Sequence, residues 1–329
     1  MKFAKDAFTV GGMTMLSRVL GFVRDMLLAA VLGTGPIAEA FFVAFRIPNL
    51  FRRIFAEGAF NSAFIPLYNK KLEEHGEQAA TKFASEAMSG LVLVLLLLTA
   101  IFEIFMPFML GGIAWGFKGD TDKYALAVEL TRIMFPYLIF LSVMALIAGV
   151  LNSFKKFAIA ALAPVLLNIV LVSCLSVLIF INFDKQADIS RVLSYAVTFA
   201  GFVQVAALWY YCKKQGHLPW FVKPTFNADM KALVKLGVPG IIAGGITQIN
   251  IVIGTGIASA YAGAVSYLYY ADRLYQLPLG VVGVAVAVVL LPSLTRAFTA
   301  NNQSEANDLQ NRALEFSMML TIPAMVAFL

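Results

Sequence analysis

The chain has 329 residues, of which 60% are hydrophobic and 13% are charged, and its formal net charge is +6. Soluble globular proteins carry about 25% charged residues, so this chain has too little polar surface to face water and a lipid bilayer must be its solvent. Long apolar runs without strict polar–apolar alternation favour helices over a β-barrel. We interpret the positive charge as loop lysines and arginines that fix topology, and we expect no nucleic-acid partner.

The apolar runs predict eight membrane segments and the start of a ninth, because one membrane helix needs roughly 20 mostly apolar residues. The predicted spans are residues 7–33, 36–67, 84–113, 124–151, 157–182, 190–212, 236–262 and 264–298, and the ninth begins near residue 310. The chain stops inside this last apolar segment, so we expect it to be a piece of a longer protein. The predicted fold class is an all-α polytopic membrane protein.

The distribution of lysine and arginine between the predicted loops indicates the orientation. One side carries 14 of these residues and the other side carries 4, namely Lys118, Lys123, Lys185 and Arg191. Cytoplasmic loops are enriched in lysine and arginine, so we predict a cytoplasmic N-terminus in a multi-pass protein of the bacterial cytoplasmic (inner) membrane.

The longest polar stretch divides the chain. Residues 1–215 are predicted to form a lobe of six membrane helices, residues 216–235 a cytoplasmic linker, and residues 236–329 the start of an incomplete second lobe. Lys231 and Lys235 are four residues apart, which is compatible with an amphipathic helix at the membrane surface. A weak repeat, in which Arg46 and Arg273 each precede a proline, supports two related halves.

Seven arginines fall inside the predicted spans: Arg18, Arg24, Arg46, Arg52, Arg53, Arg132 and Arg273. An arginine at the bilayer centre costs about 2.5–3.5 kcal/mol on insertion scales. Some have a structural explanation, because Arg53 can pair with Glu57 four residues later and Arg132 can snorkel. Arg24 and Asp25 are neighbours whose side chains are expected to point apart.

The alternative is that several of these arginines line a cavity for an anion. Arginine suits phosphate because its planar fork donates two parallel hydrogen bonds and keeps its charge. After Arg46, Pro48 removes one backbone bond, and Asn49 can bond the freed groups or a ligand. No nucleophile with its base, no phosphate-binding loop and no histidine or cysteine cluster emerges, so we expect neither an enzyme nor a cofactor nor a metal site.

Four strings of the sequence resemble the MurJ/MviN lipid II flippase family of the MOP exporter superfamily. They are MTMLSRVLGFVRD at residues 13–25, AFFVAFRIPNLFRRIFAEGAF at residues 40–60, and YYADRL at residues 269–274 with LLPSL at residues 290–294. The resemblance implies a MATE-like fold with two lobes around a central cavity. It also implies movement of the undecaprenyl-pyrophosphate-linked peptidoglycan precursor, lipid II, from the inner to the outer leaflet by alternating access.

The resemblance also implies roles for individual residues and partners. Substrate-binding arginines map onto Arg18, Arg24, Arg52 and Arg273, and cavity or gate positions map onto Ser17, Asp25, Glu39, Asn49, Glu57 and Asp272. The expected partners are lipid II, membrane lipids and the cell-wall synthesis machinery. Two alternatives stay open: a flippase for another polyprenyl-pyrophosphate-linked glycan, and a membrane scaffold that transports nothing.

Overall fold

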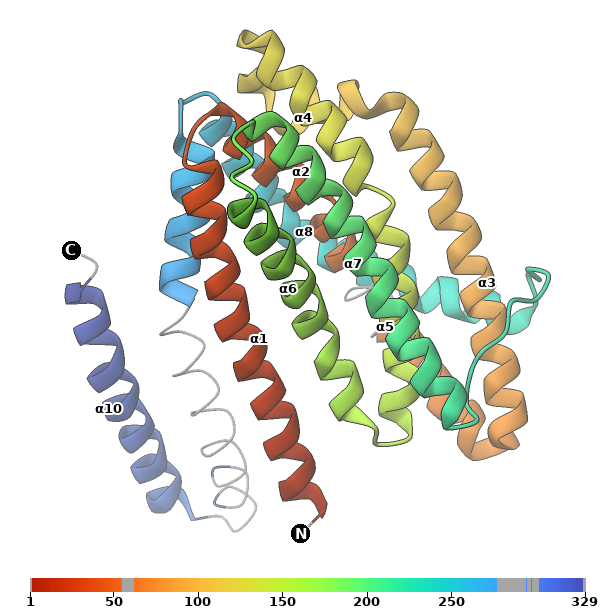
Figure 1. The fold of residues 1–329 in the computed structure, drawn as a ribbon. Helices are drawn as coiled ribbons and strands as arrows, with labels where there is room; N and C mark the ends of the chain where they lie inside the picture. Colours follow the sequence, from red (N-terminus) through yellow and green to blue (C-terminus); the bar gives the residue numbers. More distant parts are fainter. Residues whose placement is uncertain (1, 55–61, 277–293, 295–296, 298–301, 328–329) are drawn as a thin grey trace. The chain divides into compact units, whose positions relative to one another are not determined.

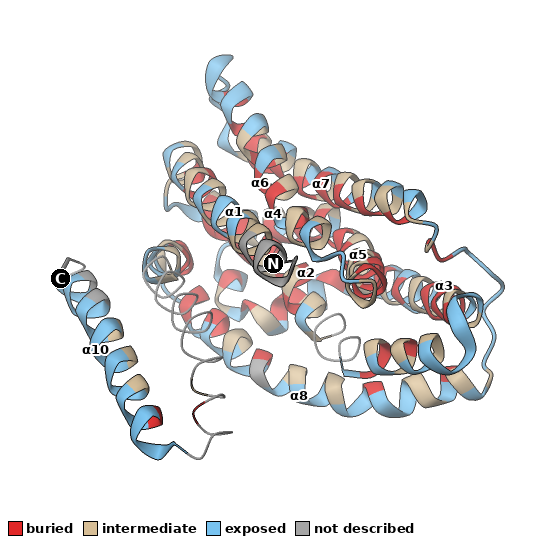
Figure 2. Cartoon of the chain, turned by 90° about the horizontal axis from the view of Figure 1, so that it is seen from below, coloured by how far each residue is buried: buried red, intermediate tan, exposed pale blue. Residues whose placement is uncertain are grey.

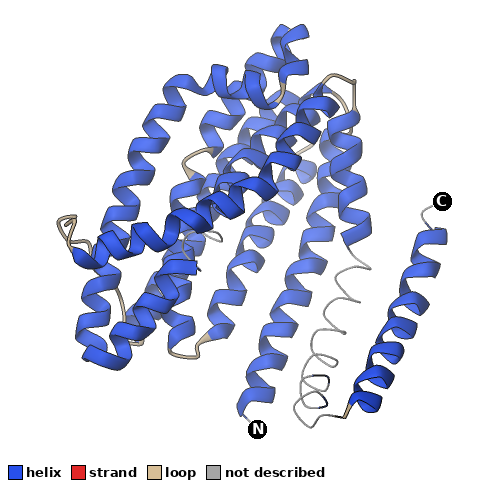
Figure 3. Cartoon of the chain, turned by 180° about the vertical axis from the view of Figure 1, so that it is seen from behind, coloured by secondary structure: helices blue, strands red, loops and turns tan. Residues whose placement is uncertain are grey.

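The structure is a computed structural model that describes residues 2–54, 62–276, 294, 297 and 302–327; within them it is helical and holds no strand (Figures 1 and 3). A helix that begins at Ala264 is described as far as Gln276. The other helices are α1 (Lys2–Leu32), α2 (Pro36–Arg52), α3 (Ile65–Ile113), the short 3₁₀ helix η2 (Trp115–Gly119), α4 (Thr121–Met134), α5 (Tyr137–Ser153), α6 (Phe157–Phe180), α7 (Gln186–Lys214), α8 (Ala228–Ser259) and α10 (Gln303–Ala327). The predicted all-α fold class is confirmed.

Five described helical stretches are long and apolar enough to cross a membrane by length and composition: Ser62–Ile113, Thr121–Ser153, Phe157–Phe180, Gln186–Lys214 and Ala228–Ser259. The helix α2 has 17 residues, fewer than the roughly 20 that a membrane span needs. Most of the predicted segment 264–298 lies outside the described residues. A multi-pass membrane protein is confirmed, whereas the count of eight segments stays a prediction.

The outer faces of these helices are apolar and exposed. Phe108, Phe180 and Ile104 are 87%, 86% and 70% exposed, and Figure 2 shows exposed residues along the outer sides of α3, α6 and α7. Each such side chain would have a transfer free energy about 1.5–3 kcal/mol less favourable in water than in an apolar environment. The hydrocarbon of a bilayer is the solvent in which this surface carries no such cost.

Two helix breaks differ from the predicted spans. Residues 68–83, expected as a loop, are helical and belong to α3, and the break falls at Gly76, which has a φ of +78°. A positive φ is readily adopted by glycine and ends the regular α-helix there. The predicted segment 124–151 is divided into α4 and α5 by a turn at Phe135 and Pro136, because proline has no N–H for the helical ladder.

The chain forms two compact units, residues 1–267 and 268–329. In the first unit α1 packs along α6, α2 packs against α4, and α7 contacts α4, α5 and α6. Its core lies between α3, α5 and α7 and contains, among others, Phe64, Phe83, Met88, Leu146 and Leu208. The division into lobes at residues 215 and 236 stays a prediction.

Residues 215–227, which include the first part of the predicted linker 216–235, are non-helical. Asn227 begins α8 by accepting a hydrogen bond from the Met230 N–H at 3.0 Å, as an N-cap residue does. Lys231 and Lys235 therefore lie in the first turns of α8. This helix has 32 residues and is about 48 Å long, so it exceeds the roughly 30 Å of bilayer hydrocarbon.

Candidate functional site

A buried ion pair lies in α1. Nε and Nη2 of Arg24 donate to Oδ1 of Asp25 at 3.0 and 2.8 Å, and each residue is 6% exposed. The expectation that these neighbours point apart is wrong. The arginine side chain is long enough to fold back onto the adjacent carboxylate. Burial favours this ion pair, because an unpaired charge in the interior raises the free energy of the folded state.

Asn168 of α6 completes this cluster. Nη1 of Arg24 donates to Oδ1 of Asn168 at 2.8 Å, and Nδ2 of Asn168 donates to the Ser17 carbonyl at 2.9 Å. Asn168 is buried and lies near Gly21, where an added Cβ would be 3.5 Å from Nδ2. We call Ser17, Arg24, Asp25 and Asn168 the Arg24 cluster. The one signal for Asn168 in the sequence is an amide inside the charge-free run 157–183.

Arg18, Asn49 and Arg52, three further predicted site residues of α1 and α2, are half-buried. Arg18 lies in α1, six residues before Arg24 and therefore about 120° around the helix, and Arg52 is the last residue of α2. Asn49 donates from Nδ2 to the carbonyl of Phe45 at 2.9 Å. The amide of Asn49 thus bonds the carbonyl four residues before it in its own helix, and not the Ala44 carbonyl that Pro48 leaves without its helical donor.

A second buried charge cluster surrounds Glu39 in the first turn of α2. Nζ of Lys123 in α4 donates to Oε2 of Glu39, and the backbone N–H of Val265 donates to Oε1 at 3.1 Å. Lys123 and Glu39 are 9% and 1% exposed, and the ammonium also lies 3.9 Å from the centroid of the Phe117 ring. The sequence alone marked Lys123 as a loop charge, so its role as the counter-ion of Glu39 was missed.

Next to this cluster, α8 is fastened to α2 and η2. Nη1 of Arg46 donates to Oγ1 of Thr255 at 2.6 Å, and the N–H of Gly116 donates to Oγ of Ser259 at 3.0 Å. The Trp115 ring lies so close to Gly256 that an added Cβ would be 2.0 Å from it. We call these contacts the α8 seam. They assign a partner to Arg46, which the sequence left undecided.

Arg132 compensates for a proline in α3. Pro107 has no N–H, so the carbonyl four residues earlier, that of Glu103, loses its helical donor. Nε of Arg132 donates to this carbonyl at 3.0 Å. A hydrogen bond to the backbone, rather than snorkelling alone, therefore explains Arg132.

The remaining predicted residues lie in the second unit or outside the described residues. In the second unit Asp272 is exposed, and Arg273 lies over the Tyr269 ring at 4.9 Å from its centroid, a cation–π arrangement. Nη1 of Arg273 donates to Oε1 of Gln276 at 3.4 Å. Glu57, with its expected pairing to Arg53, lies outside the described residues.

The two buried clusters are built around ion pairs, Arg24 with Asp25 and Lys123 with Glu39. Among the described residues no group of three or more histidine, cysteine, aspartate or glutamate side chains could hold a metal ion. Arginine exchanges a carboxylate for a phosphate with the same planar fork of donors. The guanidinium of Arg24 is thus a donor of the type from which phosphate oxygens accept hydrogen bonds.

Comparison with known proteins gives consistent matches. A family model described as lipid II flippase MurJ matches residues 28–329. The probable lipid II flippase MurJ of Rhizobium meliloti (strain 1021) is 50% identical over 330 residues, which cover 100% of this chain and 62% of the relative. The lipid II flippase MurJ of Burkholderia cenocepacia is 35% identical, over 99% of this chain and 64% of the relative. The chain thus spans about three fifths of the length of these curated relatives.

Solved structures give the same result. A lipid II flippase MurJ in an inward closed conformation matches with a TM-score of 0.77 at 29% identity, covering 96% of this chain and 64% of that one. An inward-facing multidrug resistance MATE family transporter of the MOP superfamily matches with a TM-score of 0.73 at 16% identity, over 98% of this chain and 72% of that one, which shows a shared fold. The predicted MATE-like fold is confirmed. By the family model and by relatives of up to 50% identity, the chain belongs to the MurJ lipid II flippase family.

Proposed function

We propose that this protein flips lipid II from the inner to the outer leaflet of the cytoplasmic membrane by alternating access, without catalysing a chemical reaction. The observation that carries the proposal is the Arg24 cluster, in which a guanidinium is held inside an apolar bundle by Asp25 and Asn168. Such an intramembrane charge is expensive unless it serves a ligand or a pathway. Membership of the flippase family supports a pyrophosphate as that ligand.

In the proposed cycle the pyrophosphate replaces Asp25 on Arg24. The carboxylate neutralises Arg24 while no substrate is bound, which lowers the cost of burying the guanidinium. Arg18, Arg52 and Arg273 are proposed to contribute further charge to the same anion, and Ser17, Glu39, Asn49, Glu57 and Asp272 to shape the cavity or its gates. Each negative charge that moves outward gains about 2.3 kcal/mol per 100 mV, so the roughly two charges of a pyrophosphate gain about 4–5 kcal/mol.

The α8 seam supports a closed state in this cycle. It lies at the end of the bundle opposite to the N-terminus of α1, because Glu39 beside it directly follows the loop that ends α1. The 14-to-4 bias of lysine and arginine supports a cytoplasmic N-terminus. We propose that opening of the seam releases the substrate on the outer side, and that cell-wall synthesis enzymes then receive it.

The test measures lipid II flipping by the full-length protein in cells depleted of the native copy. Arg24→Ala is expected to lower flipping at least about tenfold, because a hydrogen bond to a charged group is worth about 1.5–3 kcal/mol. The matched control is Arg191→Ala, since Arg191 is an ion-paired arginine near the start of α7, bound to Glu129 and Asp188. Equal flipping by both variants would refute the proposal.

A second variant guards against misfolding. Removing Arg24 alone takes a cation away from the buried Asp25 carboxylate, whereas Arg24→Ala combined with Asp25→Ala removes both charges of the pair and is expected to fold. This double variant should be present in the membrane yet inactive. Accumulation of a different polyprenyl-pyrophosphate glycan in the depleted cells would favour the other flippase, and normal growth without accumulation would favour the scaffold.

A further inference from the structure

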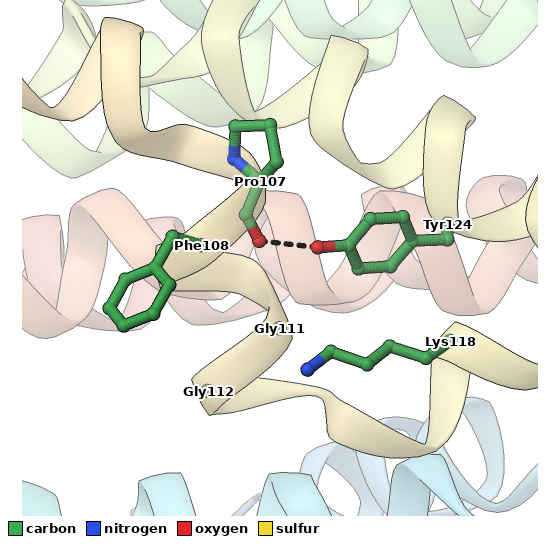
Figure 4. A pocket seen from close by; sticks show the side chains of 6 residues that line it. All are labelled: Pro107, Phe108, Gly111, Gly112, Lys118 and Tyr124. Atoms are coloured by element: carbon green, nitrogen blue, oxygen red, sulfur yellow. Dashed lines mark hydrogen bonds between the residues drawn. The ribbon is translucent and has the colours of Figure 1, made fainter.

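A surface pocket lies where α3 ends, apart from the arginine clusters. Its volume is about 420 Å³, and Pro107, Phe108, Gly111, Lys118 and Tyr124 line it together with Gly112 (Figure 4). The hydroxyl of Tyr124 donates to the carbonyl of Pro107 and fixes one wall. Gly111 makes room for the lysine, because an added Cβ would be 2.7 Å from Cε of Lys118.

The pocket lies at a membrane surface. The span Ser62–Ile113 ends beside it, and the Trp115 side chain next to it is partly exposed, as tryptophan is in the interfacial belt. Lys118 is exposed, and in the described part of the chain its ammonium has no acidic partner within ion-pair distance. The nearby Asp120 is used to cap α4, where Oδ1 accepts the N–H of Lys123 at 3.0 Å.

An apolar face of α3 leads from the pocket into the bilayer. Leu97, Ile101, Ile104 and Phe108 are all more than half exposed, and their spacing of four, three and four residues places them on one side of the helix. The distance from Leu97 to Phe108 along the helix is about 16 Å. This is about half of the 30 Å hydrocarbon core and so equals the depth of one leaflet.

We propose that the pocket binds the phosphodiester of an anionic phospholipid, of which phosphatidylglycerol is the simplest, with its acyl chains along the face from Leu97 to Phe108. Lys118 supplies the positive charge for the phosphate. A zwitterionic phosphatidylethanolamine fits less well, because its own ammonium is repelled by Lys118. One lysine near an anionic membrane surface contributes about 1 kcal/mol, which corresponds to a preference of about fivefold.

Photo-crosslinking of the full-length protein in nanodiscs tests the site. The probe is Phe108→p-benzoylphenylalanine, in discs of equal parts phosphatidylglycerol and phosphatidylethanolamine. We expect about five phosphatidylglycerol adducts for each phosphatidylethanolamine adduct, and Lys118→Gln should bring the ratio near one. The control is Phe180→p-benzoylphenylalanine, because Phe180 is equally exposed at the end of α6 and lies outside the pocket; there Lys118→Gln should change nothing.

Three outcomes would overturn the proposal. They are equal labelling by the two lipids at Phe108, a preference that survives Lys118→Gln, and an equal loss of preference at Phe180. Excess inorganic phosphate distinguishes the two sources of the anion. Loss of the labelling preference on its addition would show that the pocket recognises free phosphate rather than a lipid.

Discussion

Asn168 of α6 holds Arg24 of α1 by accepting from its Nη1 at 2.8 Å, and the same amide donates to the Ser17 carbonyl at 2.9 Å. The two attachment points on α1 are seven residues apart, which is about two helical turns. The single amide therefore fixes the height and the rotation of α1 against α6. Asn168 therefore positions Arg24 together with the charged partner Asp25.

Two replacements of Asn168 should distinguish its contribution to stability from the effect of an added negative charge on flipping. Asn168→Leu removes an acceptor from a buried guanidinium and is expected to lower the free energy of unfolding by about 1–3 kcal/mol. Asn168→Asp keeps an acceptor for Arg24 but adds a second negative charge, so it should fold and yet compete with an anionic substrate. Thermal unfolding of the purified full-length protein and flipping in cells measure the two effects. A fully active Asn168→Asp protein would contradict the exchange of Asp25 for substrate.

Two glycines of α8 offer a matched test of the α8 seam. Gly256→Ala places a Cβ 2.0 Å from the Trp115 ring, whereas Gly254→Ala meets no atom within 4 Å. Overpacking typically costs about 1–3 kcal/mol, so Gly256→Ala should lower the Tm. Gly254→Ala should leave the Tm unchanged or raise it slightly, because alanine favours the helix. Identical Tm values for the two variants would show that Trp115 does not seat on α8.

The Glu39–Lys123 pair should hold the seam closed. Lys123→Met leaves a buried carboxylate without its counter-ion, and loss of one partner of a buried pair typically costs about 3–5 kcal/mol. The combination with Glu39→Gln removes the charge while keeping an acceptor for the Val265 N–H, so it should recover much of the loss. The measurement is labelling of a buried Ser259→Cys by a membrane-impermeant maleimide, which should rise in Lys123→Met and fall again in the double variant.

A control for this experiment is Asp188→Asn, which breaks an exposed pair with Arg191. Surface pairs contribute about 0–1 kcal/mol, so labelling should stay at the level of the unmodified protein. If Asp188→Asn raised the labelling as much as Lys123→Met, the effect would be a general loss of stability rather than an opening of the seam.

The linker 215–227 should detach when two serines of α3 are changed. Oγ of Ser85 and Oγ of Ser89 each accept a backbone N–H, from Trp220 and Val222, at 2.9 Å. Each bond is worth about 1 kcal/mol, so Ser85→Ala with Ser89→Ala should accelerate limited proteolysis of the linker several-fold. Ser153→Ala is the control, because Oγ of Ser153 donates to the Gly149 carbonyl of its own helix at 3.1 Å. Unchanged cleavage in the double variant would contradict this anchoring.

The sequence predicts the fold well, because apolar runs and bilayer thickness together determine helices of a given length. It predicts the breaks poorly. Gly76 lies in a polar stretch that local composition assigns to a loop, whereas the structure has helix on both sides of Gly76 and a break only at this residue, with its φ of +78°. Pro136 lies in an apolar run whose hydropathy stays high through the turn, so hydropathy alone gives one span.

The candidate site, like the fold, contains features that the sequence predicts and features that it does not. Arginine inside an apolar run is visible as a cost, so Arg18, Arg24 and Arg46 are recognisable from the sequence. Their partners are not, because Asn168 and Lys123 reach Arg24 and Glu39 across 144 and 84 residues of chain. Which residues meet depends on how neighbouring helices are shifted and rotated, and a single sequence contains no direct record of that.

The bond from Arg132 to the Glu103 carbonyl makes Pro107 and Arg132 dependent on each other. With any other residue at position 107, the carbonyl would regain its helical donor and would no longer need the guanidinium to satisfy it. With any apolar residue at position 132, the proline would leave a bare carbonyl in the hydrocarbon. A relative that keeps the proline should therefore keep a donor at position 132, whereas a relative that lacks the proline has no need of the arginine.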